Sequence, residues 1–162
     1  MRMRMTFGSM KRLAAAGAAA VGVMASVATA SAGGAFTTTT HVNTFRGPIP
    51  VTCSGPGLSL INATGNGVQH LTVNGTGDWF TETFTGDGTL TMVPPGTTYQ
   101  GHVQTWFGTE DNNQNNVAHA TLNFDGANLA DPSQILHLHA AFQVTVNANG
   151  DMTVSNFTVD CR

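Results

Sequence analysis

The sequence predicts an all-β protein, an antiparallel β-barrel or sandwich of about 8–10 short strands closed by one disulfide. Three observations carry this prediction. Thr, Val and Phe are abundant after residue 35, and no window there has helical periodicity. Glycine pairs recur about every ten residues, a spacing typical of turns between short strands. Two cysteines lie near the two ends of this region, at Cys53 and Cys161.

The predicted strands are the stretches between turn signals in which apolar and polar residues alternate, because successive side chains of a strand point to opposite faces. They lie near residues 36–45, 48–53, 58–63, 67–74, 79–86, 89–94, 98–108, 117–125, 134–147 and 152–161. The glycine pairs Gly65/Gly67 and Gly86/Gly88 are interpreted as turns. No linker interrupts this pattern, so residues 33–162 are expected to form a single secreted β domain.

The last two predicted strands are joined by an Asn-Gly pair, a strong signal for a two-residue hairpin turn. This turn places Phe157 opposite Phe142 and Cys161 opposite Leu138, so that Cys161 faces the core.

Further upstream, the register is predicted by matching apolar faces alone. This matching pairs Leu122 with Leu136, and Phe107 with Ala118.

The first 32 residues read as a secretory signal peptide. Four basic residues precede a short run rich in Ala and Gly, which ends in the small-residue sequence Ala28-Thr29-Ala30-Ser31-Ala32. The apolar run is shorter than the roughly 20 residues that a spanning helix needs. We therefore expect cleavage after Ala32, export by the general secretory route, a secreted, extracellular protein, and no membrane span in the mature chain.

Removal of this segment changes the charge. The whole chain has a formal net charge of −3, but residues 33–162 keep only Arg46 and Arg162 against all nine acidic residues, which gives −7. A surface of this kind repels polyanions. The sequence therefore excludes a nucleic-acid partner, whose phosphates need clustered Lys and Arg.

Both cysteines lie in the exported part of the chain, where disulfides form and persist. With two cysteines only one intramolecular pairing exists, Cys53 with Cys161, and it closes a loop of 108 residues. The number and spacing exclude a CxxC redox pair and a zinc knuckle.

Three histidines are candidate metal ligands. His137 and His139 lie on one side of a predicted strand, about 6.5–7 Å apart, and the predicted register places His119 beside His139 and next to Trp106. Three neutral imidazole nitrogens could hold zinc or copper and leave a position open for water. The alternative is that these histidines lie on a solvated face of a sheet that has few charged residues.

Glu82 and Trp106 are candidate ligand contacts. Glu82 lies between Phe80 and Phe84 at alternate positions, so a carboxylate shares a face with two aromatic rings. It could anchor a ligand, or the stripe could end at a rim where Glu82 reaches water. Trp106 is placed on the same predicted face as the histidines.

The stretch Gly101-His102-Val103-Gln104-Thr105-Trp106-Phe107-Gly108, the Asn-rich segment after it and the terminal Cys161-Arg162 resemble small secreted β proteins of high-GC Gram-positive bacteria. No activity is assigned to that group. The resemblance implies a secreted β domain and brings no catalytic residues.

No phosphate-binding loop, nucleophile elbow or carboxylate pair is found, so the sequence does not favour an enzyme. We expect a binding protein for a small apolar ligand or for a protein or cell-wall surface. The alternatives are a metal-dependent enzyme that uses His119, His137 and His139, and a structural envelope protein.

Overall fold

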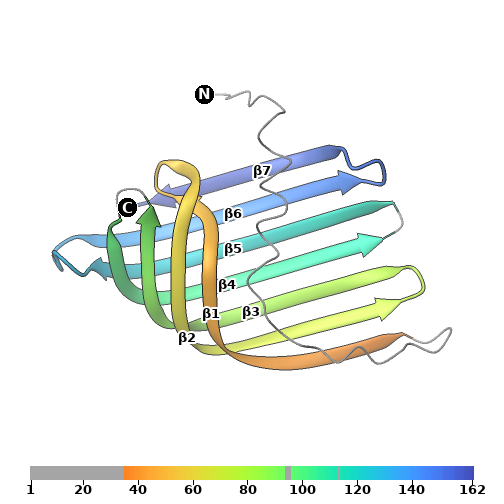
Figure 1. The fold of residues 1–162 in the computed structure, drawn as a ribbon, viewed down its shortest axis with the longest axis horizontal. Helices are drawn as coiled ribbons and strands as arrows, with labels where there is room; N and C mark the ends of the chain where they lie inside the picture. Colours follow the sequence, from red (N-terminus) through yellow and green to blue (C-terminus); the bar gives the residue numbers. More distant parts are fainter. Residues whose placement is uncertain (1–34, 94–95, 113) are drawn as a thin grey trace.

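The computed structural model describes residues 35–93, 96–112 and 114–162, which form one antiparallel sheet of seven strands. Each strand pairs with its neighbour in sequence, so the sheet order is β1-β2-β3-β4-β5-β6-β7 (Figure 1). The strands are β1 (Phe36–Thr52), β2 (Gly55–Asn74), β3 (Gly77–Val93), β4 (Thr98–Asn112), β5 (Asn115–Asn128), β6 (Ile135–Asn147) and β7 (Met152–Cys161). The predicted signal peptide at residues 1–32 lies outside the described residues. Within those residues, no helix has the length and apolar character needed to cross a membrane.

The all-β class is confirmed, but the prediction of 8–10 short strands is wrong. Glycines interpreted as turns lie inside long strands: Gly65 is in β2, opposite Gly86 in β3. Gly88 also continues β3 and lies opposite Gly101 in β4. The sequence therefore splits β1, β2 and β3 into two strands each where the structure has one.

These glycines lie where the sheet bends. A Cβ atom on Gly88 or Gly101 would collide with the main chain of the neighbouring strand, at Asn62 and Asp125 respectively. Glycine is therefore required here for close backbone approach. Beyond these glycines, β1 to β4 fold over one end of β5 to β7. The folded-over parts are the halves nearest the β1–β2 and β3–β4 hairpins (Figure 1).

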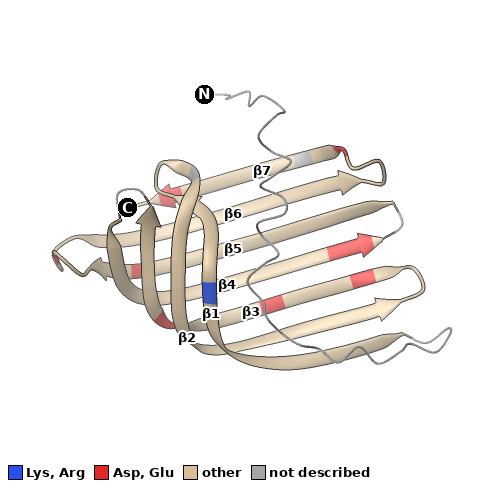
Figure 2. Ribbon diagram, in the orientation of Figure 1, with Lys and Arg blue, Asp and Glu red and all other residues tan. Residues whose placement is uncertain are grey.

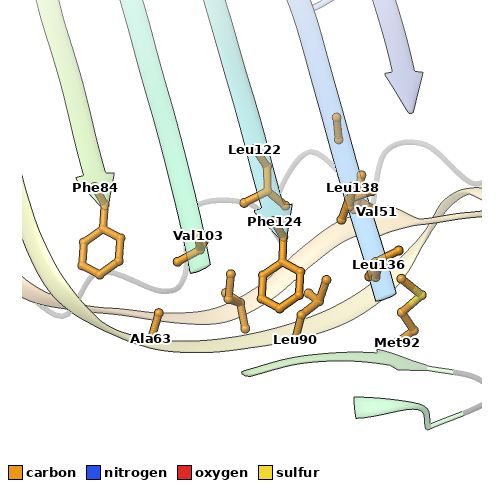
Figure 3. Close-up of a cluster of buried hydrophobic side chains, with 12 residues drawn as sticks. Val51, Ala63, Phe84, Leu90, Met92, Val103, Leu122, Phe124, Leu136 and Leu138 are labelled. Carbon is orange, nitrogen blue, oxygen red and sulfur yellow. The ribbon is translucent and has the colours of Figure 1, made fainter. Parts of the chain in front are cut away.

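The core lies between this folded-over part and the sheet beneath it. Leu90 and Val103 have no exposed surface, and Phe124 is 1% exposed. In Figure 3, Phe124 of β5 and Leu90 of β3 point toward each other across the two layers. The buried cluster is Val51, Ile61, Ala63, Phe84, Leu90, Met92, Val103, Leu122, Phe124, Leu136, Leu138 and Ala140. We call this half of the sheet the closed half and the other half, which no other described strand covers, the open half.

The predicted disulfide is confirmed. Cys53, in the turn after β1, is bonded to Cys161 at the end of β7, with Cα atoms 5.6 Å apart. Among the described strands β1 and β7 do not pair, so the sheet is not closed and the predicted barrel is not confirmed. The disulfide joins the two edges of the sheet at the closed half by a covalent bond in place of a hydrogen-bonded ladder.

The predicted register of the last hairpin is confirmed at two pairs, Phe142 with Phe157 and Leu138 with Cys161. The predicted two-residue turn is wrong: the Asn147 amide donates to the Asp151 carbonyl, so three residues form the turn, and the register shifts between Thr145 and Val146. The register upstream is wrong. Leu122 pairs with Ala140 and not with Leu136, a difference of four residues.

The β4–β5 pairing differs from the prediction as well, by two residues, because Phe107 pairs with Ala120. The turns account for both differences. The Asn112 side chain accepts hydrogen bonds from the Gln114 and Asn115 amides, which sets the β4–β5 turn. Between β5 and β6, the Asn128 amide donates to the Gln134 carbonyl. Apolar parity cannot distinguish registers that differ by an even number of residues.

Candidate functional site

The two faces of the open half differ in chemistry. Cross-strand partners share a face, so the residues on the core side can be followed outward from Phe84 and Leu122 into the open half. They are predominantly apolar. We call this surface the open inner face; its apolar members are Phe36, Leu71, Val73, Phe80, Phe107, Ala118, Ala120, Phe142, Val144 and Val146.

Burial changes along this face. Phe84, at the boundary with the closed half, is 3% exposed. Phe80, Phe107 and Phe142 in the open half are only partly buried, and Phe36 at the edge is 51% exposed. The rings of Phe80 and Phe107 contact each other, with centroids 6.1 Å apart. Large contiguous apolar surface of this kind marks interaction sites in soluble proteins.

Glu82 lies on the open inner face and does not reach water at a rim. Its side chain is buried, with the residue 7% exposed. One carboxylate oxygen, Oε2, accepts a hydrogen bond of 2.9 Å from Nε2 of Gln69, its cross-strand partner in β2. On the other side Glu82 lies opposite Phe107. A buried polar pair therefore lies next to the aromatic residues Phe80 and Phe107 on this face.

Gln69 is a residue that sequence reasoning missed. The available signal was period-two alternation: Gln69, Leu71 and Val73 occupy alternate positions in one strand and so share a face.

The Gln69–Glu82 pair makes a testable prediction. Gln69→Leu is expected to lower the free energy of unfolding by about 1–3 kcal/mol, because the Glu82 carboxylate stays buried without its donor. Adding Glu82→Leu should recover most of this loss, since replacing both partners by apolar groups is nearly neutral. Urea denaturation of the two variants measures both effects. Gln104→Leu, on the exposed outer face, is the matched control and should change stability by less than about 0.5 kcal/mol. A Gln69→Leu variant as stable as the wild type would contradict this account.

The three candidate metal ligands all lie on the outer face, but the structure does not bring them together. His119 pairs with Gln143, whereas His139 pairs with Asn123. His137 Nδ1 donates to Asp125 Oδ1 at 2.6 Å, and His139 Nδ1 bonds Asn123 Oδ1 at 2.7 Å. In the described part of the chain, no group of three or more His, Cys, Asp or Glu side chains is placed to hold a metal ion.

A row of alternating acids and histidines crosses this outer face instead. Asp87, His102, Asp125 and His137 are successive cross-strand partners on β3, β4, β5 and β6. His102 Nδ1 donates to Asp87 Oδ1 at 2.9 Å, and its Nε2 is 3.1 Å from the Thr85 hydroxyl. The imidazoles in this row are hydrogen-bonded to neighbouring carboxylates. This arrangement favours the alternative of a polar sheet face over a metal site.

Trp106 also lies on the outer face, as predicted. Its indole is 38% exposed, and its centroid is 6.4 Å from that of the His119 ring. The two ligand candidates from the sequence, Glu82 and Trp106, are therefore on opposite faces of the sheet.

Asp131 lies in the β5–β6 loop, outside both surfaces. Hydrogen bonds from the Ser133 hydroxyl and the Gln134 side-chain amide hold the pKa of its carboxyl below the usual value. This carboxylate orders the loop that sets the β5–β6 register.

No protein-family model, curated protein or solved structure matches the chain.

Proposed function

We propose that this protein is an extracellular binding protein that holds an apolar ligand on the open inner face. The observation that carries the proposal is the contrast along one face of one sheet. This face is buried in the closed half, whereas in the open half, which no other described strand covers, its large apolar residues are only partly buried. The extracellular location rests on the signal-like residues 1–32 and is compatible with the disulfide.

The ligand would lie against the sheet and not inside it. The closed half is packed with side chains, since Leu90, Val103 and Phe124 are at most 1% exposed. An elongated apolar molecule fits the open inner face better than a compact one, because its apolar residues extend over six strands, from Phe36 in β1 to Val146 in β6.

Charge supports a particular head group. The acidic residues on the open inner face are Glu82, Asp78 and Asp111, and the last two are exposed cross-strand partners at its outer end. None of the described residues of the open half is Lys or Arg. Of the two described basic residues, Arg46 pairs with Asn62 in β2 and Arg162 is hydrogen-bonded to His137, both toward the closed half. A surface with this charge disfavours an anionic head group. The proposed ligand is therefore a long-chain amphiphile whose head group is uncharged or cationic.

The proposal is tested by titrating the purified protein with the apolar fluorophore N-phenyl-1-naphthylamine. We expect saturable binding that dodecyltrimethylammonium displaces below its micellar concentration and that dodecyl sulfate does not. Phe107→Ser and Phe142→Ser should each weaken binding by about ten- to a hundredfold, the equivalent of the roughly 1.5–3 kcal/mol gained by burying one such side chain.

Leu60→Ser is the matched control, because Leu60 is 47% exposed on the outer face of the closed half. It should leave binding unchanged. Absence of probe binding, or equal loss in Leu60→Ser and Phe107→Ser, would overturn the proposal. Sedimentation equilibrium tests whether a second copy of the chain covers this face instead. Concentration-dependent dimers that Phe107→Ser disrupts would show that it does, as expected for a structural protein.

A further inference from the structure

The outer face of the open half is hollowed beside Trp106. The hollow has a volume of about 310 Å³ and extends across β4, β5, β6 and β7. Trp106 and His119 form one wall, and Gln143, Asn156 and Thr158 form the other. The small side chain of Ala141, between them in the sheet, leaves the space open.

The indole of Trp106 lies beside Gly108, two residues along the same strand. A Cβ atom on Gly108 would lie 2.7 Å from Cη2 and 2.9 Å from Cζ2 of the indole, so the ring occupies space that a side chain at residue 108 would need. Trp106 is 38% exposed, and the exposed part of the side chain is available to a ligand.

Two amide side chains near the indole make no hydrogen bond within the described part of the chain. In the neighbouring row, His139 is bonded to Asn123 and His102 to Asp87. The amides of Gln143 and Asn156, by contrast, make no side-chain hydrogen bond with any described residue. Amide groups that lie free beside an exposed aromatic ring can bind ligand hydroxyl groups.

A second hollow continues the surface on the other side of Trp106. It has a volume of about 400 Å³ and extends from His41 in β1 to Gln104 in β4. Thr83, which lines it, is the direct cross-strand partner of Trp106. Since neighbouring strands are about 4.8 Å apart, the two hollows together cross the seven strands over roughly 29 Å.

The lining of both hollows disfavours ionic ligands. None of the residues that line them is Lys, Arg, Asp or Glu. β6 has no charged residue at all, and the acidic residues of β5 and β7 lie near the closed half (Figure 2).

We propose that this outer surface binds an uncharged polysaccharide chain, with one sugar ring stacked on Trp106. A sugar ring presents C–H groups on its faces and hydroxyl groups around its edge. The first suit an exposed indole, and the second suit the Thr, Asn and Gln side chains around it. A hollowed surface that crosses the whole sheet suits a chain of sugars better than a single one. The site is independent of the proposed amphiphile site, because the two lie on opposite faces.

Affinity electrophoresis tests the proposal. The protein without residues 1–32, which migrates as an anion, is run in native gels that contain hydroxyethylcellulose, mannan, dextran or soluble starch. We expect retardation by at least one of these neutral polysaccharides. Trp106→Ala should weaken it by about tenfold, the effect of losing one aromatic stacking contact. Gln143→Ala should weaken it less.

Trp79→Ala is the matched control, because Trp79 is also on the outer face, on the adjacent strand, but lines neither hollow. It should leave retardation unchanged, and so should Phe107→Ser on the inner face. Migration unaffected by all four polysaccharides would overturn the proposal, as would equal loss in Trp79→Ala and Trp106→Ala. Retardation by gelatin alone, lost in Trp106→Ala, would assign the surface to a polypeptide and also overturn it. The naphthylamine titration is unaffected by each of these outcomes, so failure of this proposal and failure of the amphiphile proposal are distinguishable.

Discussion

Removing the Cys53–Cys161 disulfide is expected to lower the free energy of unfolding by about 4–5 kcal/mol. The bond closes a loop of 108 residues, and on the chain-entropy account a loop of that length constrains the unfolded chain by this amount. The folded state adds a second reason. Among the described strands β1 and β7 share no hydrogen bonds, so the disulfide alone links the two edges covalently at the closed half.

Urea denaturation of the Cys53→Ser/Cys161→Ser double variant, with the oxidised wild type beside it, measures this effect. Dithiothreitol should destabilise the wild type by a similar amount and leave the double variant unchanged. Amide hydrogen exchange should accelerate most around Val51 and Val159, next to the bond. A loss of less than about 1 kcal/mol would show that packing of the folded-over strands holds the closed half together without the cross-link.

Gly101→Ala is expected to lower the free energy of unfolding by about 3 kcal/mol or more, the upper end of the range for overpacking. A methyl group here would meet the main chain at Asp125 and Gly126, and backbone atoms cannot move aside as the end of a side chain can. The bend that brings Leu90 over Phe124 would open, so the core would lose packing as well.

Gly75→Ala is the matched control. Gly75 lies in the β2–β3 turn, and no heavy atom is within 4 Å of the position its Cβ would take. Its free energy of unfolding should change by less than about 0.5 kcal/mol. Thermal unfolding followed by far-ultraviolet circular dichroism checks both variants. Equal free energies of unfolding for Gly75→Ala and Gly101→Ala would contradict the role given to Gly101 at the bend.

The two proposed sites divide along the sheet's two faces. Because side chains alternate, the same strands present Phe107 on the inner face and Trp106 on the outer face. The two proposals assign an uncharged polysaccharide to one face and an amphiphile to the other. Variants on each face should therefore affect one activity and not the other.

Residue alternation predicted the faces correctly but not the strand lengths. Gly65, Gly86 and Gly88 have the composition of turns, and local sequence does not distinguish a turn from a place where two backbones approach closely. The distinction depends on what lies across the strand, which for Gly86 is Gly65, 21 positions earlier. Sequence spacing alone could not supply that pairing.

The candidate site shows the same difference between what alternation predicts and what depends on strand pairing. Placing Glu82 among aromatic residues needed only the period of two, and so did placing Trp106 with the histidines. Whether His119 meets His139 depended on register, and register depended on turns held by the Asn112 side chain and by the Asn128–Gln134 contact. A shift of four residues keeps every apolar residue on its face and still separates the histidines.

The sequence by itself determined the all-β class, the Cys53–Cys161 pairing and the register of the Asn-Gly hairpin. Each depends on local chemistry or on a choice with one solution: residue alternation for the class, the single possible pairing of two cysteines, and the Asn-Gly turn signal for the hairpin. Only the tertiary structure decided that the sheet bends once, buries half of one face and leaves the other half open. That outcome depends on backbone contacts between paired strands, where the absence of a side chain at a few glycines allows neighbouring main chains to approach closely.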